Sequence, residues 1–78
     1  MYIIVMLCND DDKYYIDYVD EVFKDYKDAK HKMNRCVLSE RDSLETDGTK
    51  VEIIRDVDKV WLELNGNIIT AYEILKFS

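Results

Sequence analysis

A chain of 78 residues with 47% hydrophobic residues and no proline is long enough for one small domain, and we expect a single folded domain over residues 1–78. Its formal net charge of −6 argues against direct binding to nucleic acid, because two negative partners repel and release no counterions. The same charge argues against an anionic membrane surface. A positively charged protein is the partner that this charge favours.

The first predicted element is an apolar run at residues 2–8, "YIIVMLC", whose β-branched residues predict a strand buried on both faces. The run is too short for a membrane span or for a signal peptide, and no basic segment precedes it. We therefore expect a cytoplasmic protein. Cys8 and Cys36 form neither a disulfide framework nor a CxxC pair, so we expect both thiols to be reduced.

A polar turn separates this run from a second predicted strand at residues 14–23, "YYIDYVDEVF". Side chains alternate along this segment, with Tyr14, Ile16 and Tyr18 on one face. Tyr15 and Asp17 fall on the other face. Such alternation is typical of a half-exposed strand, and the short turn predicts antiparallel pairing with the first strand.

The hydrophobic period changes to that of a helix at Asp25, which can cap the first turn. One apolar stripe runs along this helix and consists of Tyr26, Ala29, Met33, Cys36 and Val37. We expect the helix to reach at least residue 38. Glu40 falls within the stripe, which argues for an end nearby, whereas Leu44 returns to it. The segment "SERDSLE" is therefore either a continuation of the helix or a loop, and "TDGT" supplies the stop.

The remaining segments predict strands. "VEIIRDV" at residues 51–57 gives one strand, and "KVWLEL-NG-NIITAYEILKF" at residues 59–77 gives a hairpin, because Asn-Gly favours a tight type I′ turn. A two-residue turn would pair Leu64 with Asn67, Leu62 with Ile69 and Val60 with Ala71. The element order is thus β-β-α-β-β-β, an α+β fold in which one amphipathic helix packs on a small, mostly antiparallel sheet.

This arrangement leaves an imbalance between the two faces of the sheet. One helix can cover only one face, yet the first strand and the hairpin are apolar on both faces. Either residues 39–50 wrap around the second face, or another protein covers it. A homodimer through this uncovered face is one form of the second alternative.

No residue pattern points to catalysis, to a metal site or to a cofactor, so we do not expect an enzyme. His31 is the single histidine and stands among lysines, without a nucleophile at a useful spacing. An EF-hand loop that starts at Asp10 would need glycine and glutamate at its sixth and twelfth positions, and Tyr15 occupies the sixth. Two glycines in the whole chain exclude a phosphate-binding loop.

The segment at residues 9–28 concentrates negative charge and aromatic side chains, with eight acids, three lysines and four tyrosines. Tyrosines beside carboxylates are typical of protein interfaces that attract basic partners. We therefore expect the partner-binding residues to be Asp10, Asp11, Asp12, Tyr15, Asp17, Asp20 and Glu21. The alternative is that these acids only keep a small protein soluble.

The stretch "YVDEVFKDYKDAKHKM" followed by "AYEILKF" looks like small acidic domains from phages and mobile elements, and the chain resembles inhibitors of the anti-CRISPR type. A bias toward Ile, Tyr, Asn, Lys and Asp, which AT-rich codons produce, accompanies this resemblance. The resemblance implies an inhibitor that binds tightly and performs no catalysis in the cytoplasm of the host cell. It transfers no functional residue.

Three hypotheses follow for the function. In the first, the acidic and tyrosine-rich face occupies the basic nucleic-acid-binding surface of a host defence enzyme, for example a CRISPR effector, and excludes its nucleic acid. In the second, the domain is a structural or adaptor module that self-associates through the uncovered sheet face. In the third, which net charge disfavours most, the basic side of the helix binds nucleic acid directly.

Overall fold

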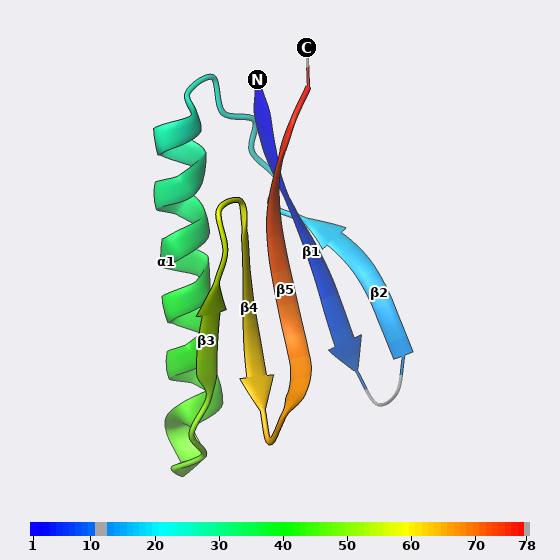
Figure 1. The fold of residues 1–78 in the computed structure, drawn as a ribbon, viewed down its shortest axis with the longest axis vertical. Coiled ribbons are helices and arrows are strands. Elements are labelled where there is room, and N and C mark those ends of the chain that lie inside the picture. Colours follow the sequence, from blue (N-terminus) through cyan, green and yellow to red (C-terminus); the bar gives the residue numbers. More distant parts are fainter. Residues whose placement is uncertain (11–12, 78) are drawn as a thin grey trace.

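The computed structural model describes residues 1–10 and 13–77, which fold into five strands, one α-helix and a short 3₁₀ helix, as expected for a small α+β protein (Figure 1). The elements are β1 (Tyr2–Asp10), β2 (Lys13–Tyr18), α1 (Tyr26–Leu44), η1 (Glu45–Asp47), β3 (Glu52–Arg55), β4 (Lys59–Leu64) and β5 (Asn67–Lys76). The predicted order β-β-α-β-β-β is therefore confirmed.

The five strands form one antiparallel sheet in the order β2-β1-β5-β4-β3. A short turn joins β4 to β5, and the chain that passes through α1 returns to the opposite edge of the sheet. The first and last strands of the chain lie side by side, so that Met1 N–H and Phe77 N–H each donate to the other residue's carbonyl at 2.9 Å. Both termini emerge at the same end of the molecule (Figure 1).

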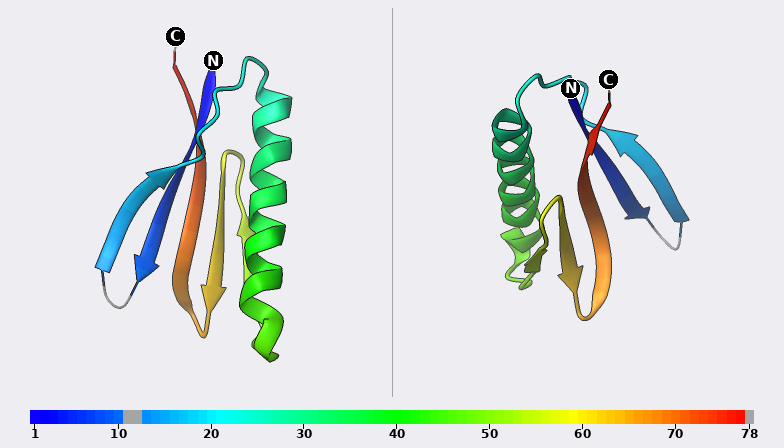
Figure 2. Two further views of the ribbon diagram at one scale, coloured as in Figure 1. Left: turned by 180° about the vertical axis from the view of Figure 1, so that it is seen from behind. Right: turned by 45° about the horizontal axis from the view of Figure 1, so that its top comes forward.

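The helix packs on one face of the sheet through the stripe that the sequence predicts. Ala29, Met33 and Val37 are fully buried, and they contact a core that includes Ile4 and Leu62. In Figure 1 α1 lies behind β3 and in the reverse view of Figure 2 it lies in front, away from β2 in both views. One side of the sheet therefore packs against the helix, while the β2 edge extends beyond it.

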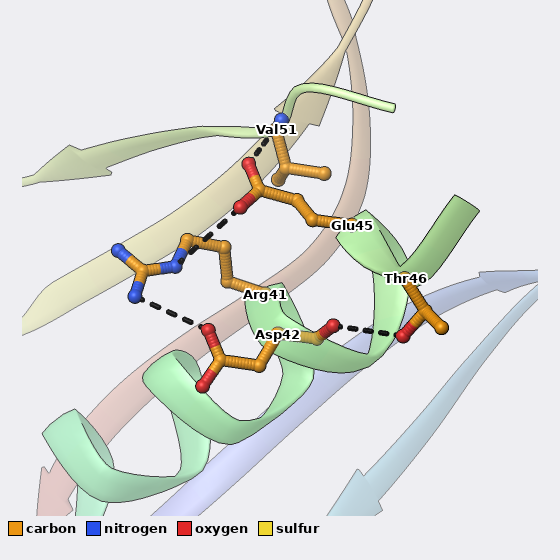
Figure 3. Close-up of polar contacts among 5 residues, drawn as sticks. All are labelled: Arg41, Asp42, Glu45, Thr46 and Val51. Atoms are coloured by element: carbon orange, nitrogen blue, oxygen red, sulfur yellow. Dashed lines mark hydrogen bonds and ion pairs between the residues drawn. The ribbon is translucent and has the colours of Figure 1, made fainter. Parts of the chain in front are cut away.

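The helix continues through the segment that the sequence leaves open between helix and loop. Its C-terminal end is tied down by polar contacts, which Figure 3 shows. Glu45 accepts a hydrogen bond of 2.9 Å from Val51 N–H just before β3, and Thr46 Oγ1 donates to the Asp42 carbonyl at 3.0 Å. Gly48 then takes a φ of +87°, the left-handed conformation that ends helices.

The hairpin turn is predicted correctly, but its register is not. Asn65 and Gly66 have positive φ values of 53° and 81°, as a type I′ turn requires, and Leu64 pairs with Asn67. A bulge between Leu62 and Glu63 then shifts the ladder by one residue. The predicted pairs of Leu62 with Ile69 and Val60 with Ala71 are wrong, because Leu62 pairs with Thr70 and Val60 with Tyr72.

This shift decides which side chains enter the core, because a slip of one residue moves a strand's side chains to the other face. Tyr72 and Ile74 lie on the same face as Val60 and Leu62, and all four are buried under α1. Without a bulge, the predicted pairs would place Tyr72 and Ile74 on one face of the sheet and Val60 and Leu62 on the other face. That expectation is wrong for this reason.

The second strand is also shorter than expected, since β2 ends at Tyr18 instead of Phe23. Glu21 N–H donates to the Val19 carbonyl at 2.7 Å, which bends the chain, and Phe23 then forms an isolated bridge with Tyr2. Phe23 is 8% exposed and belongs to the core. Phe23 therefore does not end β2; it fixes the segment that connects β2 to α1 against the core.

The face of the sheet opposite α1 has no cover among the described residues. Residues 39–47 belong to α1 and η1 and do not wrap around this face, so that expectation is not met. Leu7, Tyr14, Ile16, Tyr18 and Leu75 on this face are between 41% and 76% exposed. We call this surface the open face.

Candidate interaction surface

β2 is an edge strand, and all six of its residues are exposed. Val19 N–H donates to the Ile4 carbonyl at 3.0 Å, and hydrogen bonds alternate along an antiparallel ladder. The backbone groups of Tyr14, Ile16 and Tyr18 therefore point away from β1 toward the free edge. The Asp17 carboxylate accepts a hydrogen bond of 2.8 Å from Tyr18 N–H, which occupies one of these edge donors.

The structure places the predicted contact residues along this edge, but not all in one patch. Tyr15 pairs with Cys8 and Asp17 with Met6, so both lie on the helix side of the sheet. Asp20 and Glu21 follow in the bent segment after β2 and are exposed. We call Tyr15, Asp17, Asp20 and Glu21 the acidic edge.

One further predicted contact residue, Asp10, lies at the opposite end of β2. Asp10 is the last residue of β1 and its backbone pairs with Lys13. Asp11 and Asp12 lie outside the described residues. The described part of the predicted set is thus divided between the end of β1 and the acidic edge.

A groove of about 620 Å³ separates α1 from the acidic edge on the helix side of the sheet. Its lining consists of Met6, Val19, Lys32, Arg35, Cys36, Ser39, Glu40, Ser43 and Tyr72. The helix side of this groove is basic through Lys32 and Arg35, whereas Asp17 lies on the β2 side. Because Glu40 offsets only part of the positive charge of Lys32 and Arg35, a positively charged partner is attracted to the acidic edge more than to the groove.

A buried polar network forms the floor of the groove, and the sequence interpretation missed it. Glu40 accepts hydrogen bonds from Thr70 Oγ1 at 2.6 Å and from the Tyr72 hydroxyl. Burial, reinforced by the hydrogen bond to this carboxylate, raises the pKa of Tyr72. The available signal was the position of Glu40 inside the apolar stripe, which required polar partners on the facing strand.

The two thiols lie near this network, and Cys36 lines the groove. Burial raises the pKa of the Cys8 thiol, and a hydrogen bond with Tyr15 offsets part of that rise. Tyr15 therefore lies next to the Cys8 side chain on the helix side of the sheet. A raised pKa lowers the thiolate fraction, and the thiolate is the reactive form of cysteine.

The described residues offer neither a metal-binding cluster nor a membrane-spanning helix. Within residues 1–10 and 13–77, no three histidine, cysteine, aspartate or glutamate side chains are grouped so that they could hold a metal ion. Over the same part of the chain, no helix is both long and apolar enough to cross a membrane.

No protein-family model, no curated protein and no solved structure matches this chain.

Proposed function

We propose that this protein is a non-catalytic inhibitor that places its acidic edge against the basic nucleic-acid-binding surface of another protein and thereby excludes the nucleic acid. The phage and mobile-element inhibitors that the chain resembles suggest a defence enzyme of a bacterial host, such as a CRISPR effector, as the target. The protein itself supplies charge and shape and no bond-making step.

The observation that carries this proposal is the state of the carboxylates on the acidic edge. Among the described residues, Asp17, Asp20 and Glu21 form no ion pair with a lysine or arginine of this chain. The carboxylates of Asp42 and Glu45 at the end of α1 differ, because Arg41 lies within 4.0 Å of each. Negative charge on the acidic edge is therefore available to an external partner.

The position of these charges also suits docking. They lie at the edge of the sheet, where a partner can contact them without entering the groove. The groove is less favourable to a basic partner, because Lys32 and Arg35 of α1 line it. Complementary charge accelerates encounter, and a carboxylate that pairs with arginine in a desolvated contact gives a strong hydrogen bond. Tyr15 adds a half-exposed ring, on which the alkyl stem of a partner lysine or arginine can pack.

Charge reversal at Asp20 and Glu21 tests the proposal. Neither side chain is needed for the sheet, and each reversal changes the charge by two, so Asp20→Lys with Glu21→Lys brings the net charge from −6 to −2. Asp42→Lys with Glu52→Lys is the matched control, because both residues are exposed and lie away from β2. A triple reversal would bring the net charge to zero, where proteins precipitate most readily.

The immobilised wild-type protein and both double variants are incubated with nuclease-treated lysate of a bacterium with an AT-rich genome. We expect the wild type and the control to retain nucleic-acid-binding proteins that added DNA or RNA displaces. The Asp20/Glu21 variant should bind the same proteins at least about tenfold more weakly, because each lost charged hydrogen bond costs about 1.5–3 kcal/mol. Equal retention by the two double variants, or retention that nucleic acid does not displace, contradicts the proposal.

A further inference from the structure

The open face carries an apolar row that crosses the whole sheet. The register aligns one residue from each strand on this face, in the order Ile16, Leu7, Ala71, Trp61 and Ile54. All five side chains are apolar except for the indole N–H of Trp61. This group donates a hydrogen bond of 2.8 Å to the carboxylate of Glu63. An uncharged row that reaches both edges of a sheet is unusual for a face exposed to water.

The exposed apolar area on this face is large for so small a chain. Leu7, Tyr14, Ile16, Tyr18 and Leu75 are 41%, 67%, 76%, 57% and 43% exposed. With roughly 200 Å² for each large side chain, these five expose roughly 550 Å², the upper end of what monomers show. The half-buried neighbours Ile3, Val5 and Trp61 extend the patch toward the 800 Å² or so that each partner of a stable complex buries.

The charge on this face fits a second copy better than a basic partner. The β1 and β2 part of the face carries no charged side chain, and on β5 and β4 Glu73 lies 4.0 Å from Lys59. The remaining charges of this face, Glu63 on β4 and Glu52 on β3, lie toward the far edge of the sheet. Two copies of a chain with net charge −6 repel one another over most of their surfaces. They repel least where the open face of one meets the open face of the other.

The face also contains a projection and a hollow of its own. Ile16 on β2 is the most exposed large apolar side chain that the structure describes. Ala71 on β5 has a small side chain, and a hollow of about 240 Å³ lies over it between Leu7 and Trp61. Ile16 and Ala71 share a row and are separated by β1, so the projection and the hollow lie about 10 Å apart.

We propose that a second copy of this chain covers the open face and forms a two-fold symmetric dimer. A two-fold axis that runs along β1 above Leu7 maps β2 of one copy onto β5 of the other and keeps each residue in its row. Ile16 of each protomer then enters the hollow over Ala71 of its partner, and Tyr18 comes to lie over Glu73. The stacked sheets form a sandwich with the two helices on its outer sides.

This dimer does not depend on the proposed inhibitory function. Asp17 and Tyr15 point to the helix side of β2, and Asp20 and Glu21 follow the strand, so the acidic edge stays outside the dimer contact. The dimer therefore displays two acidic edges. Loss of the dimer and loss of partner binding are separable results.

The test measures the mass of the protein in solution by sedimentation equilibrium at micromolar to submillimolar concentration. We expect the wild type to reach twice the chain mass. Ile16→Glu should raise the dimer dissociation constant at least about tenfold, since it places a charge in the hollow of the partner. Val57→Glu is the matched control, because Val57 is 72% exposed in the β3–β4 turn, and it should dimerise like the wild type.

A second variant separates dissociation from unfolding. Ala71→Leu fills the hollow with a side chain that suits a sheet surface, and it should also dissociate the dimer while circular dichroism stays that of the wild type. A wild type that remains a monomer over the whole concentration range overturns the proposal. The proposal is also overturned if Ile16→Glu and Ala71→Leu have the same dimer dissociation constant as Val57→Glu.

Discussion

At the scale of single residues, Glu40 has the environment that departs most from its sequence context. A carboxylate in the apolar stripe of a helix suggested that the helix ends there. Instead Thr70 and Tyr72 on β5 donate to it, and the helix continues for another turn. The stripe alone could not reveal this, because the partners come from a strand 30 residues away whose register depends on the bulge.

Tyr72 makes the stability of the fold depend on alkaline pH. Its pKa is raised by burial and by Glu40, whereas tyrosines of the unfolded chain ionise near pH 10. Above about pH 10 the unfolded chain loses a proton that the folded chain retains. The contribution of Tyr72 to the free energy of unfolding should therefore be present in full below about pH 10. Above that pH the free energy of unfolding should fall by up to about 1.4 kcal/mol per pH unit for this group.

Tyr72→Phe tests this dependence through urea unfolding followed by Trp61 fluorescence at pH 8 and pH 11. At pH 8 the variant should be about 1–2 kcal/mol less stable than the wild type, because Glu40 loses a donor. At pH 11 the difference should shrink, because phenylalanine does not ionise. Tyr14→Phe, at an exposed phenol, is the control, and a Tyr72→Phe difference that is equal at both pH values contradicts the argument.

The residues of the acidic edge show how far single-residue prediction reached. The alternation of β2 correctly separates Tyr15 and Asp17 from Tyr14, Ile16 and Tyr18. The sequence could not show that Lys32 and Arg35 line a groove on the side that Asp17 faces. Local period decides which face a residue occupies, whereas the neighbours across that face come from distant segments.

At the scale of elements, the type of every strand and of the helix could be predicted, and the boundaries and one register could not. The Asn65-Gly66 turn fixed the hairpin because few other residues adopt two successive positive φ values. The bulge at Leu62 and Glu63 has no local signal of this kind. The bulge places Tyr72 and Ile74 in the core under α1, and that core forms only when distant segments pack together.

β2 is the element most exposed to unwanted pairing, and Asp17 limits that pairing. Its carboxylate occupies Tyr18 N–H at the free edge, and charged side chains on edge strands also oppose edge-to-edge association. Asp17→Ala should therefore aggregate several-fold faster than the wild type when light scattering is followed near the unfolding midpoint. Its urea midpoint should change little, because the residue is exposed.

Asp20→Ala is the control for this experiment, since it removes the same charge from an exposed position that makes no hydrogen bond to the edge. It should aggregate at close to the wild-type rate. Equal acceleration by the two variants would show that net charge, and not protection of Tyr18 N–H, restrains association.

At the scale of the whole molecule, the protein is a two-layer structure whose second face is open. The sequence predicted this imbalance from apolar residues on both faces of the first strand and from a single helix. It left open whether the chain itself would cover the second face. The extension of α1 to Leu44 settles this point for the described residues, because it uses the segment that could have wrapped around the sheet.

The position of each strand in the sheet predicts an order of amide hydrogen exchange. β5 pairs with β1 and with β4, so its amides are covered on both sides, whereas β2 pairs only with β1. We expect the β5 amides to exchange most slowly, at the rate of global unfolding. The amides of Tyr14 and Ile16 should exchange much faster than those of β5, because they point to the free edge.

Exchange measured residue by residue by NMR checks this order, and Tyr15 provides an internal control because its amide points toward β1. The proposed dimer stacks faces and leaves the β2 edge free, so dimerisation should not slow the amides of Tyr14 and Ile16 as much as those of β5. Protection of these two amides equal to that of β5 would instead show that another strand pairs with β2.

The pairing of Met1 with Phe77 has a consequence for any chain attached to this domain. A tag, a linker or a neighbouring module would leave the domain from one pole, whichever end carries it. The β4–β5 turn and the C-terminal end of β1 lie at the opposite pole (Figure 1). A linker of a few glycines between the two ends would therefore give a circular chain without distorting any strand. A protein fused at either end would not contact the opposite pole.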